Sequence, residues 1–263
     1  MTGSGEENHM KYKETAKVIR QECLMEGIYS MWIQTEQIAR EAVPGQFISV
    51  YSRDSSRMLP RPISLCEIDR EQGSLRIVYR VAGAGTAEFS GYQAGDDIEI
   101  LGPLGNGFPL TEKKAMLIGG GIGVPPMLEL AKQLTGEKVI VAGYRDSLFL
   151  DQELSANGAF YVATEDGSTG TKGNVMDAIA VSGLEADVIY ACGPKPMLRA
   201  IQAYAIAHGI ECYLSLEERM ACGVGACLAC VCKSTEVDGH THVHSKRICK
   251  EGPVFLATEV ELD

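Results

Sequence analysis

Four cysteines fall within one short stretch of this chain, ACGVGACLACVC. The first three, Cys222, Cys227 and Cys230, are separated by four and then two residues, which is the spacing of plant-type [2Fe–2S] sites. Small residues between them, including Gly223 and Gly225, leave room for backbone N–H groups to approach the sulfides. The stretch therefore predicts a binuclear iron–sulfur cluster, which requires a fourth thiolate further along the chain.

Two cysteines are candidates for that fourth ligand. Cys232 lies two residues after Cys230, so a strand would place both sulfurs on one face, but this would leave the far side of the cluster uncovered. Cys249 can return from a hairpin and close the cage.

Two other metal centres are weaker alternatives. A zinc site could combine the thiolates with His242 or His244, but zinc sites favour paired C-x2-C elements, and this stretch has one. A Rieske centre needs two histidines on one iron, and the HTHVH segment has no second C-x-x-H element beside it. We expect the histidines to lie on a solvated loop.

The remaining composition narrows the class of protein. The chain has nine cysteines, and its start, MTGSGEENHM, lacks the basic and apolar regions of a secretory signal, so we expect thiols in a reducing, cytoplasmic compartment. We expect residues 1–10 to be disordered, with Met10 as the natural start. The net charge of −11 disfavours nucleic acid as a partner, and no apolar run is long enough to span a membrane.

The pattern of short strands and turns predicts three parts. Residues 11–110 contain several short β-rich runs bounded by Gly, Pro or Asp, which is typical of an antiparallel barrel. Residues 111–211 alternate apolar strands with helical spacing, which predicts a doubly wound α/β domain with a parallel sheet. Residues 212–263 carry the cysteines and form a small cluster-binding domain.

The α/β part contains two glycine-bearing turns at strand ends. LIGGGIGVPPML reads as a strand, a glycine turn and a helix, although the strict G-x-G-x-x-G fingerprint fails at Val124. The missing side chains would let a pyrophosphate reach backbone N–H groups and the helix N-terminus, although tight packing alone would also require glycine. YACGPKPML is a second turn of this kind, as a pocket at a topological switch point needs. The candidate nucleotide-binding residues are Gly119, Gly120, Gly121, Ile122, Gly123, Cys192, Gly193 and Pro194.

Three elements of the predicted barrel favour an anion. In the RPIS segment, Arg61 can bind a diphosphate through two hydrogen bonds, and Ser64 can hydrogen-bond a ring nitrogen. The segments VYR and GAGT add a second cation, backbone N–H groups and a hydroxyl. The candidate residues are Arg61, Pro62, Ile63, Ser64, Val78, Tyr79, Arg80, Gly85 and Thr86.

In this order, RPIS, GAGT, GGGIGVPP and CGP resemble the ferredoxin–NADP reductase superfamily. The resemblance implies that the barrel holds FAD and the α/β domain holds the nicotinamide cofactor. It implies that Arg61 binds the FAD diphosphate, that Ser64 lies near the flavin N5, and that Tyr79, Arg80, Gly85 and Thr86 complete the site. Ile63 stands where that family commonly has tyrosine.

The stretches GPLGNGF, EDGSTGTKG, SLEERMACGVGACLACVC and CKEGPVF resemble, more narrowly, the electron-transfer subunits of class B dihydroorotate dehydrogenase. That family implies Cys249 as the fourth ligand, with Cys232 a bystander. It implies an FMN-containing catalytic partner in a heterotetramer with two copies of each chain, and electron flow from dihydroorotate through the cluster and FAD to NAD⁺ in pyrimidine biosynthesis. NAD is favoured over NADP because Asp146 beside Arg145 opposes a 2′-phosphate.

Because cofactors carry such chemistry, we predict no catalytic acid or base in this chain. Two alternatives remain. The same cofactors could serve an NAD(P)H-dependent reductase subunit of a transhydrogenase or a sulfur-reducing hydrogenase. The chain could also be a zinc-stabilised interaction module without redox activity.

Overall fold

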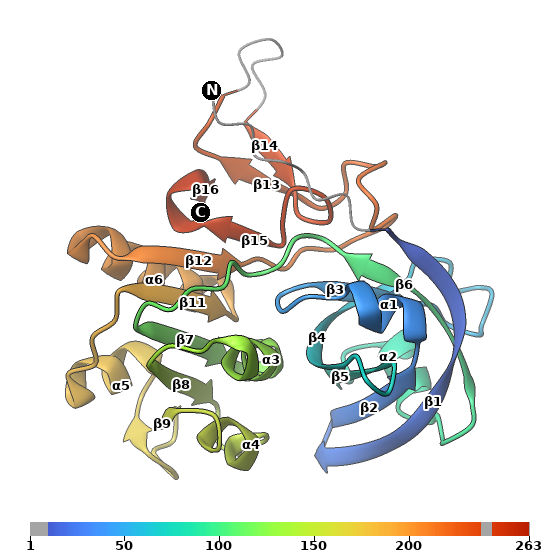
Figure 1. Cartoon of the computed structure of the whole chain (residues 1–263), viewed down its shortest axis with the longest axis horizontal. Coiled ribbons are helices and arrows are strands. Elements are labelled where there is room, and N and C mark those ends of the chain that lie inside the picture. The colour runs from blue at the N-terminus through green and yellow to red at the C-terminus, as the bar shows by residue number, and fades with distance from the viewer. Residues whose placement is uncertain (1–9, 238–243, 263) are drawn as a thin grey trace.

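The computed structural model describes residues 10–237 and 244–262 and has three connected parts. Figure 1 shows a β-barrel on the right, an α/β sheet with its helices on the left, and the cysteine-bearing segment above both. The predicted N-terminal disorder over residues 1–9 and the possible ligand His242 lie outside the described residues.

The barrel is closed and antiparallel, with six strands in the order β1-β2-β5-β4-β3-β6. β1 and β2 pair across a turn in which Gly27 adopts a φ of +75°, a conformation that glycine reaches without a steric penalty. Side chains such as Ile48, Leu65 and Ile77 alternate into the barrel interior and are fully buried there. The predicted antiparallel barrel is therefore confirmed. Its elements are β1 (Tyr12–Met25), β2 (Ile28–Gln34), α1 (Glu36–Glu41), β3 (Phe47–Val50), β4 (Arg61–Asp69), β5 (Ser74–Arg80), α2 (Ala84–Phe89) and β6 (Asp97–Leu104).

The second part is a seven-stranded sheet in the order β10-β9-β8-β7-β11-β12-β15. Six strands are parallel and β15 is antiparallel to β12. The chain moves outward from β7 on one side and returns to β11 on the other, so the carboxyl ends of β7 and β11 form a topological switch point. The strands are β7 (Ala115–Gly120), β8 (Lys138–Tyr144), β9 (Ala159–Thr164), β10 (Thr171–Lys172), β11 (Val188–Cys192), β12 (Glu211–Ser215) and β15 (Val254–Leu256).

Helices cover both faces of this sheet, which confirms the doubly wound prediction. α3 and α4 pack against the face toward the barrel, and α5 and α6 against the other (Figure 1). α3 begins with two prolines, which lack the N–H groups that a first helical turn leaves unpaired, and α6 ends at Gly209 with φ +67°. The elements are η1 (Gly121–Gly123), α3 (Pro125–Gln133), α4 (Asp151–Ser155), α5 (Val175–Ser182) and α6 (Lys195–His208).

The C-terminal segment shares strands with the sheet. The predicted boundary between residues 211 and 212 falls inside β12, and β15 returns from the far end of the chain to pair with it. The cysteines lie between these two strands in sequence, so the sheet edge anchors the cluster segment at both ends. A separate three-stranded sheet, in the order β14-β13-β16, completes it. Its elements are β13 (Val231–Ser234), β14 (Ser245–Arg247), η2 (Ala257–Glu259) and β16 (Val260–Glu261).

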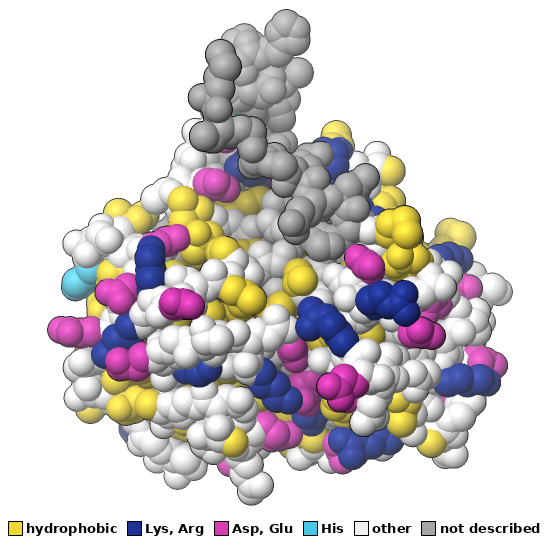
Figure 2. Space-filling model, in the orientation of Figure 1, with side chains coloured by type: hydrophobic (Ala, Val, Ile, Leu, Met, Phe, Trp, Pro, Cys, Tyr) yellow, Lys and Arg dark blue, Asp and Glu magenta, His cyan; other side chains and the backbone are white. Residues whose placement is uncertain are grey.

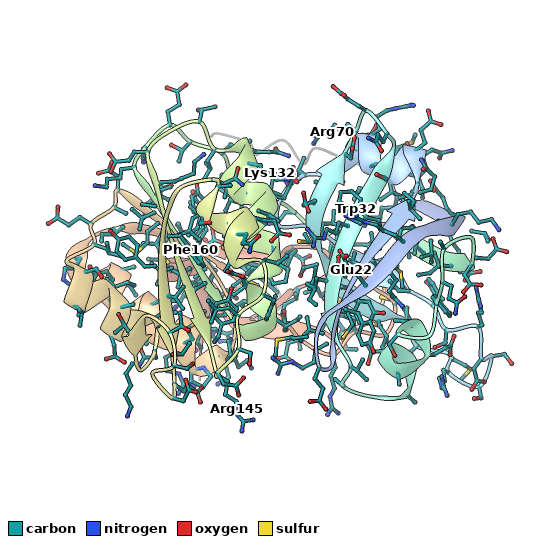
Figure 3. All side chains as sticks on the ribbon, turned by 90° about the horizontal axis from the view of Figure 1, so that it is seen from below. Glu22, Trp32, Arg70, Lys132, Arg145 and Phe160 are labelled. Carbon is teal, nitrogen blue, oxygen red and sulfur yellow. The ribbon has the colours of Figure 1, made fainter. Side chains whose placement is uncertain are left out.

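Charged side chains, of which Arg76 and Glu129 are buried, join the barrel to the α/β domain. Arg76 on β5 donates to Glu67 on β4 at 2.5 Å and to Glu153 on α4 at 3.2 Å. Lys132 on α3, labelled at the boundary between the two parts in Figure 3, also pairs with Glu67. Glu129 on the same helix accepts from a barrel backbone N–H at 2.9 Å. The network fixes how the two parts face each other.

The outer surface mixes both signs of charge. On the face that Figure 2 shows, Lys and Arg side chains lie among Asp and Glu side chains. Within residues 10–237 and 244–262, no helix has the length and apolar character needed to cross a membrane.

Candidate cofactor sites

A cavity of about 530 Å³ lies where the three parts meet. The barrel contributes the RPIS strand and the end of β5, and the α/β domain contributes its glycine turn. The segment that leads to Cys222 closes one side. The cavity is large enough for part of a large cofactor. Its walls are formed by Phe47, Arg61, Pro62, Ile63, Ser64, Val78, Tyr79, Arg80, Ala82, Thr86, Ile122, Ser215, Leu216, Glu217, Glu218, Arg219, Met220 and Pro253.

Arg61 lies at the start of β4 against the turn that opens α2. A Cβ at Gly85 would lie 2.7 Å from Arg61 Nε and 2.8 Å from its Nη2, so only glycine lets the guanidinium approach this turn. Arg61 also donates to the carbonyl of Leu59. The guanidinium of Arg61 therefore lies against the GAGT segment and provides a cation at the cavity edge.

Two of the predicted barrel residues use their polar groups elsewhere. Tyr79 is buried in the barrel core, and its hydroxyl donates to Gln21 Oε1 at 2.7 Å. The Thr86 hydroxyl accepts from the backbone N–H of Ala82 at 2.9 Å and of Gly83 at 3.2 Å. Both residues line the cavity, but their hydroxyl groups are already paired within the barrel.

The glycine turn after β7 is packed more tightly than its sequence indicates. A Cβ at Gly123 would lie 2.2 Å from the carbonyl oxygen of Cys192, and one at Gly120 would lie 2.4 Å from Met197 Sδ. A Cβ at Gly119 would meet the backbone of the same turn at 2.7 Å. Close packing therefore accounts for three of the four glycines.

Gly121 differs from the other three glycines. It adopts a φ of +54°, and the atom nearest to a Cβ placed there would be Arg80 Nη2 at 3.6 Å. Arg80 is exposed and comes from the barrel, so a cation of one domain faces the glycine turn of the other. The neighbouring Ile122 reaches the cavity itself. The candidate nucleotide turn and the candidate flavin cavity are therefore directly adjacent.

The second turn, Cys192-Gly193-Pro194, lies beside the first because β7 and β11 are neighbours with Gly119 opposite Cys192. Cys192 is fully buried, and burial raises the pKa of its thiol, so it stays protonated near neutral pH. Gly193 has a φ of +158° and α6 follows directly. Its side chain packs in the apolar cluster that also contains Leu117 and Val124.

The four predicted cluster ligands form two close pairs. The Sγ atoms of Cys222 and Cys227 lie 3.3 Å apart. The backbone N–H of Cys249 points to Cys230 Sγ at 3.5 Å, and both of these residues are buried. A binuclear cluster needs two thiolates on each iron, and the two pairs match that arrangement.

Backbone N–H groups in the cysteine loop point at sulfur. Burial raises the pKa of Cys222, but N–H groups of Cys227, Val224 and Ala226 outweigh it and lower this pKa to about 6. The N–H of Gly225 donates to Cys249 Sγ at 3.2 Å. At Cys222 these donors stabilise thiolate, which is the form that binds iron. At Cys249, burial and the neighbouring Cys230 thiol outweigh the Gly225 donor and raise the pKa.

Cys232 lies apart from the two pairs. Its Sγ faces the carbonyl of Lys246 at 3.5 Å on the hairpin of β13 and β14, and it lines a different cavity. His244 is exposed, and its backbone carbonyl accepts from Ser234. Among the described residues, no three Cys, His, Asp or Glu side chains converge on one point that could hold a single ion. The two cysteine pairs fit a binuclear cluster, in which each iron takes two thiolates.

The segment 215–220 was not predicted from the sequence as part of a site. It leads from the carboxyl end of β12 to Cys222 and lines the cavity with Glu217, Glu218 and Met220. Glu217 is accessible to solvent, but neighbouring atoms reduce the hydration of its carboxyl and so raise its pKa. The available signal was its position at the end of a parallel strand, where ligands bind in open sheets.

Solved structures with the same architecture define the class. A ferredoxin–NADP⁺ reductase from Neisseria gonorrhoeae, solved with bound FAD and NADP, superimposes with a TM-score of 0.63 at 15% identity over 75% of this chain and 92% of that one. A chain of the NADH-dependent reduced ferredoxin–NADP oxidoreductase, described for flavin-based electron bifurcation, gives a TM-score of 0.86 at 28% identity over 95% of this chain and 91% of that one. The fold is that of the ferredoxin–NADP reductases.

Sequence comparison defines the family. Residues 217–261 match the model of the iron–sulfur cluster binding domain of dihydroorotate dehydrogenase B. The chain is 47% identical to the dihydroorotate dehydrogenase B (NAD(+)), electron transfer subunit of Geobacillus kaustophilus, over 95% of this chain and 99% of that protein. The same-named protein of Fusobacterium nucleatum is 43% identical over 89% and 93% of the two chains. The chain belongs to this family of electron transfer subunits, as the sequence resemblance predicted.

Proposed function

We propose that this chain is an NAD-linked electron-transfer subunit. It passes electrons between the FMN of a dihydroorotate dehydrogenase catalytic subunit and NAD⁺, through a [2Fe–2S] cluster and FAD. One observation carries the proposal: a single cavity is lined by the RPIS strand, by Ile122 of the glycine turn and by the segment that runs into Cys222. A flavin bound there adjoins both the nucleotide turn and the cluster loop.

The residues of the cavity suit FAD. Arg61, held against Gly85, provides the cation for the diphosphate, and Ser64 provides a hydroxyl on the same strand. Ile63 on β4 and Val78 on the neighbouring β5 provide apolar side chains in the cavity wall. Tyr79 supports the wall from inside the barrel and does not offer its hydroxyl.

The switch point suits the nicotinamide dinucleotide, with Gly121 and the following helix α3 as its anion-binding turn. The preference for NAD rests on the end of β8. Arg145 has an 85% exposed side chain that points into solvent (Figure 3) and pairs with Asp146 at 3.8 Å. The carboxylate of Asp146 disfavours a 2′-phosphate at this position.

The two cysteine pairs, Cys222 with Cys227 and Cys230 with Cys249, are the proposed ligands of the cluster. With all groups bound, two-electron hydride chemistry at the nicotinamide is converted at the flavin into the one-electron transfer that the cluster supports. The chain contributes binding and orientation. The charges of Arg76 and its partners hold the barrel against the α/β domain, and the shared sheet edge of β12 and β15 holds the cysteine loop beside the cavity.

The partner subunit carries the dihydroorotate site in this proposal, and two copies of each chain form a heterotetramer in the cytoplasm. The cytoplasmic assignment rests on the nine cysteines, which are all free thiols in the structure, since disulfides are rare in that compartment. A second candidate is the electron-transfer subunit of an NADH-dependent transhydrogenase. It is favoured by the structural likeness at a TM-score of 0.86.

Anaerobic purification from native cells tests the proposal. We expect about two iron and two sulfide ions and one FAD per chain, together with an equimolar FMN-containing partner that makes orotate from dihydroorotate. A partner without FMN, in a complex that instead reduces NADP⁺ with reduced ferredoxin, would favour the second candidate. A colourless chain without iron or flavin would exclude both.

A further inference from the structure

One buried hydroxyl beneath the cysteine loop has no partner. Ser49 lies on β3 of the barrel and is completely buried, and its Oγ makes no hydrogen bond. A buried hydroxyl without a partner costs free energy relative to one that is paired, so such groups are rare and call for a physical reason. The hydroxyl is therefore a candidate donor to a group that binds beside it.

The position of Ser49 follows from strand alternation. Ile48 and Val50 point into the barrel core, so Phe47 and Ser49 point outward. Phe47 joins the apolar cluster that also contains Cys230 and Cys249. The outward face of β3 is thus the surface against which the cysteine loop packs.

Gly223 brings the loop onto Ser49. It follows Cys222 directly, has a φ of +69°, and a Cβ placed on it would lie 2.9 Å from Ser49 Oγ. Leu104 Cδ1 lies 3.3 Å from the same point, so the loop backbone is pressed against β3 and β6. The unpaired hydroxyl therefore faces the backbone of the residue that follows Cys222, one of the proposed cluster ligands.

We propose that Ser49 donates a hydrogen bond to the sulfur shell of the [2Fe–2S] cluster, either to the Cys222 thiolate or to a sulfide. This hydrogen bond raises the reduction potential of the cluster. The reduced cluster carries one more negative charge than the oxidised one, so a donor to sulfur stabilises the reduced form more. The inference rests on the proposed function, because it requires the cluster.

The test compares the full chain, loaded with FAD and cluster, with its Ser49→Ala variant. Reductive titration followed by electron paramagnetic resonance gives the cluster potential. We expect the variant to keep its cluster and FAD. Its cluster potential should fall, because the equilibrium constant for cluster reduction becomes roughly threefold to tenfold smaller than in wild type. For one electron a tenfold change is about 59 mV. The flavin potentials should not move.

Ser234→Ala is the matched control. Ser234 is also buried and belongs to the cysteine-bearing segment, but its hydroxyl donates to the carbonyl of Glu236 at 2.9 Å. This control should keep the wild-type potential. The cluster-free proteins give a second readout: Ser49→Ala should unfold at the same temperature as wild type or higher, because it removes an unpaired polar group.

Each result decides the inference. The inference is overturned if Ser49→Ala has the wild-type cluster potential, or if Ser234→Ala shows the same shift. It is also overturned if the cluster-free Ser49→Ala protein does not fold. If Ser49→Ala folds with FAD but holds no cluster, the Ser49→Thr variant decides: a wild-type potential supports the inference, and absence of the cluster there overturns it. A wild-type chain without iron and sulfide would instead refute the proposed function, before any variant is compared.

Discussion

Replacing Arg76 by methionine tests whether buried charges hold the two nucleotide-binding parts together. Arg76 is 4% exposed and donates to Glu67, Glu153 and, at 2.8 Å, Ser30. Removing one partner of a buried pair costs about 3–5 kcal/mol. Glu67 keeps Lys132, and Glu153 is 43% exposed, so we expect a smaller loss of about 2–3 kcal/mol. For 263 residues the entropy of unfolding is about 0.55 kcal/mol/K, so this loss lowers the melting temperature by roughly 4–5 °C.

Thermal unfolding of the flavin-loaded chain measures this loss. Arg145→Met is the control: its ion pair with Asp146 is exposed, so its free energy of unfolding should stay within about 0.5 kcal/mol of wild type. A cycle with Glu67→Gln should show that the losses at Glu67 and Arg76 are not additive. Flavin reduction by NADH should also slow in Arg76→Met, because the two sites lose their fixed orientation. If Arg76→Met and Arg145→Met both melt at the wild-type temperature, the ion pairs of Arg76 do not hold the two parts together.

Four further substitutions test the sites. Cys249→Ser should abolish or cripple the cluster, whereas Cys232→Ser should leave iron, sulfide and the visible spectrum unchanged; the reverse pattern would overturn the ligand assignment. Gly123→Ala would place a Cβ 2.2 Å from the carbonyl of Cys192, so it should destabilise the chain by about 1–3 kcal/mol in urea unfolding, and an unchanged midpoint would mean that the turn can move. Arg61→Met should lower the FAD content and leave iron and sulfide intact, and full retention of FAD would remove Arg61 from the site.

Local patterns in the sequence were sufficient for much of the fold. The hairpin around Gly27 and the two prolines that open α3 depend on backbone preferences of single residues, so they are visible without a structure. The parallel sheet with its switch point followed from alternating strands and helices. The order of the RPIS, GAGT, glycine-turn and CGP segments then indicated the class, which the solved structures confirm.

The remainder depends on contacts between distant parts of the chain. Pairing of β15 with β12 joins residues about forty positions apart, and nothing local indicates it. The hydroxyl of Thr86 accepts from two backbone N–H groups of the turn in which it lies, which the sequence alone does not indicate. Close packing between β7 and β11 explains Gly123 without any ligand. The role proposed for Ser49 depends on which loop covers β3, and only the three-dimensional arrangement shows that.

Anaerobic electron flow through the purified complex is the measurement that decides whether this chain connects dihydroorotate oxidation to NAD⁺. Dihydroorotate is added to the complex of this chain with its FMN-containing partner, and the spectra of cluster and FAD are followed. We expect both to become reduced and NAD⁺ then to reoxidise them with formation of NADH. The isolated chain should be reduced by NADH and not by dihydroorotate. A complex that oxidises dihydroorotate while the cluster and FAD of this chain stay oxidised would contradict it.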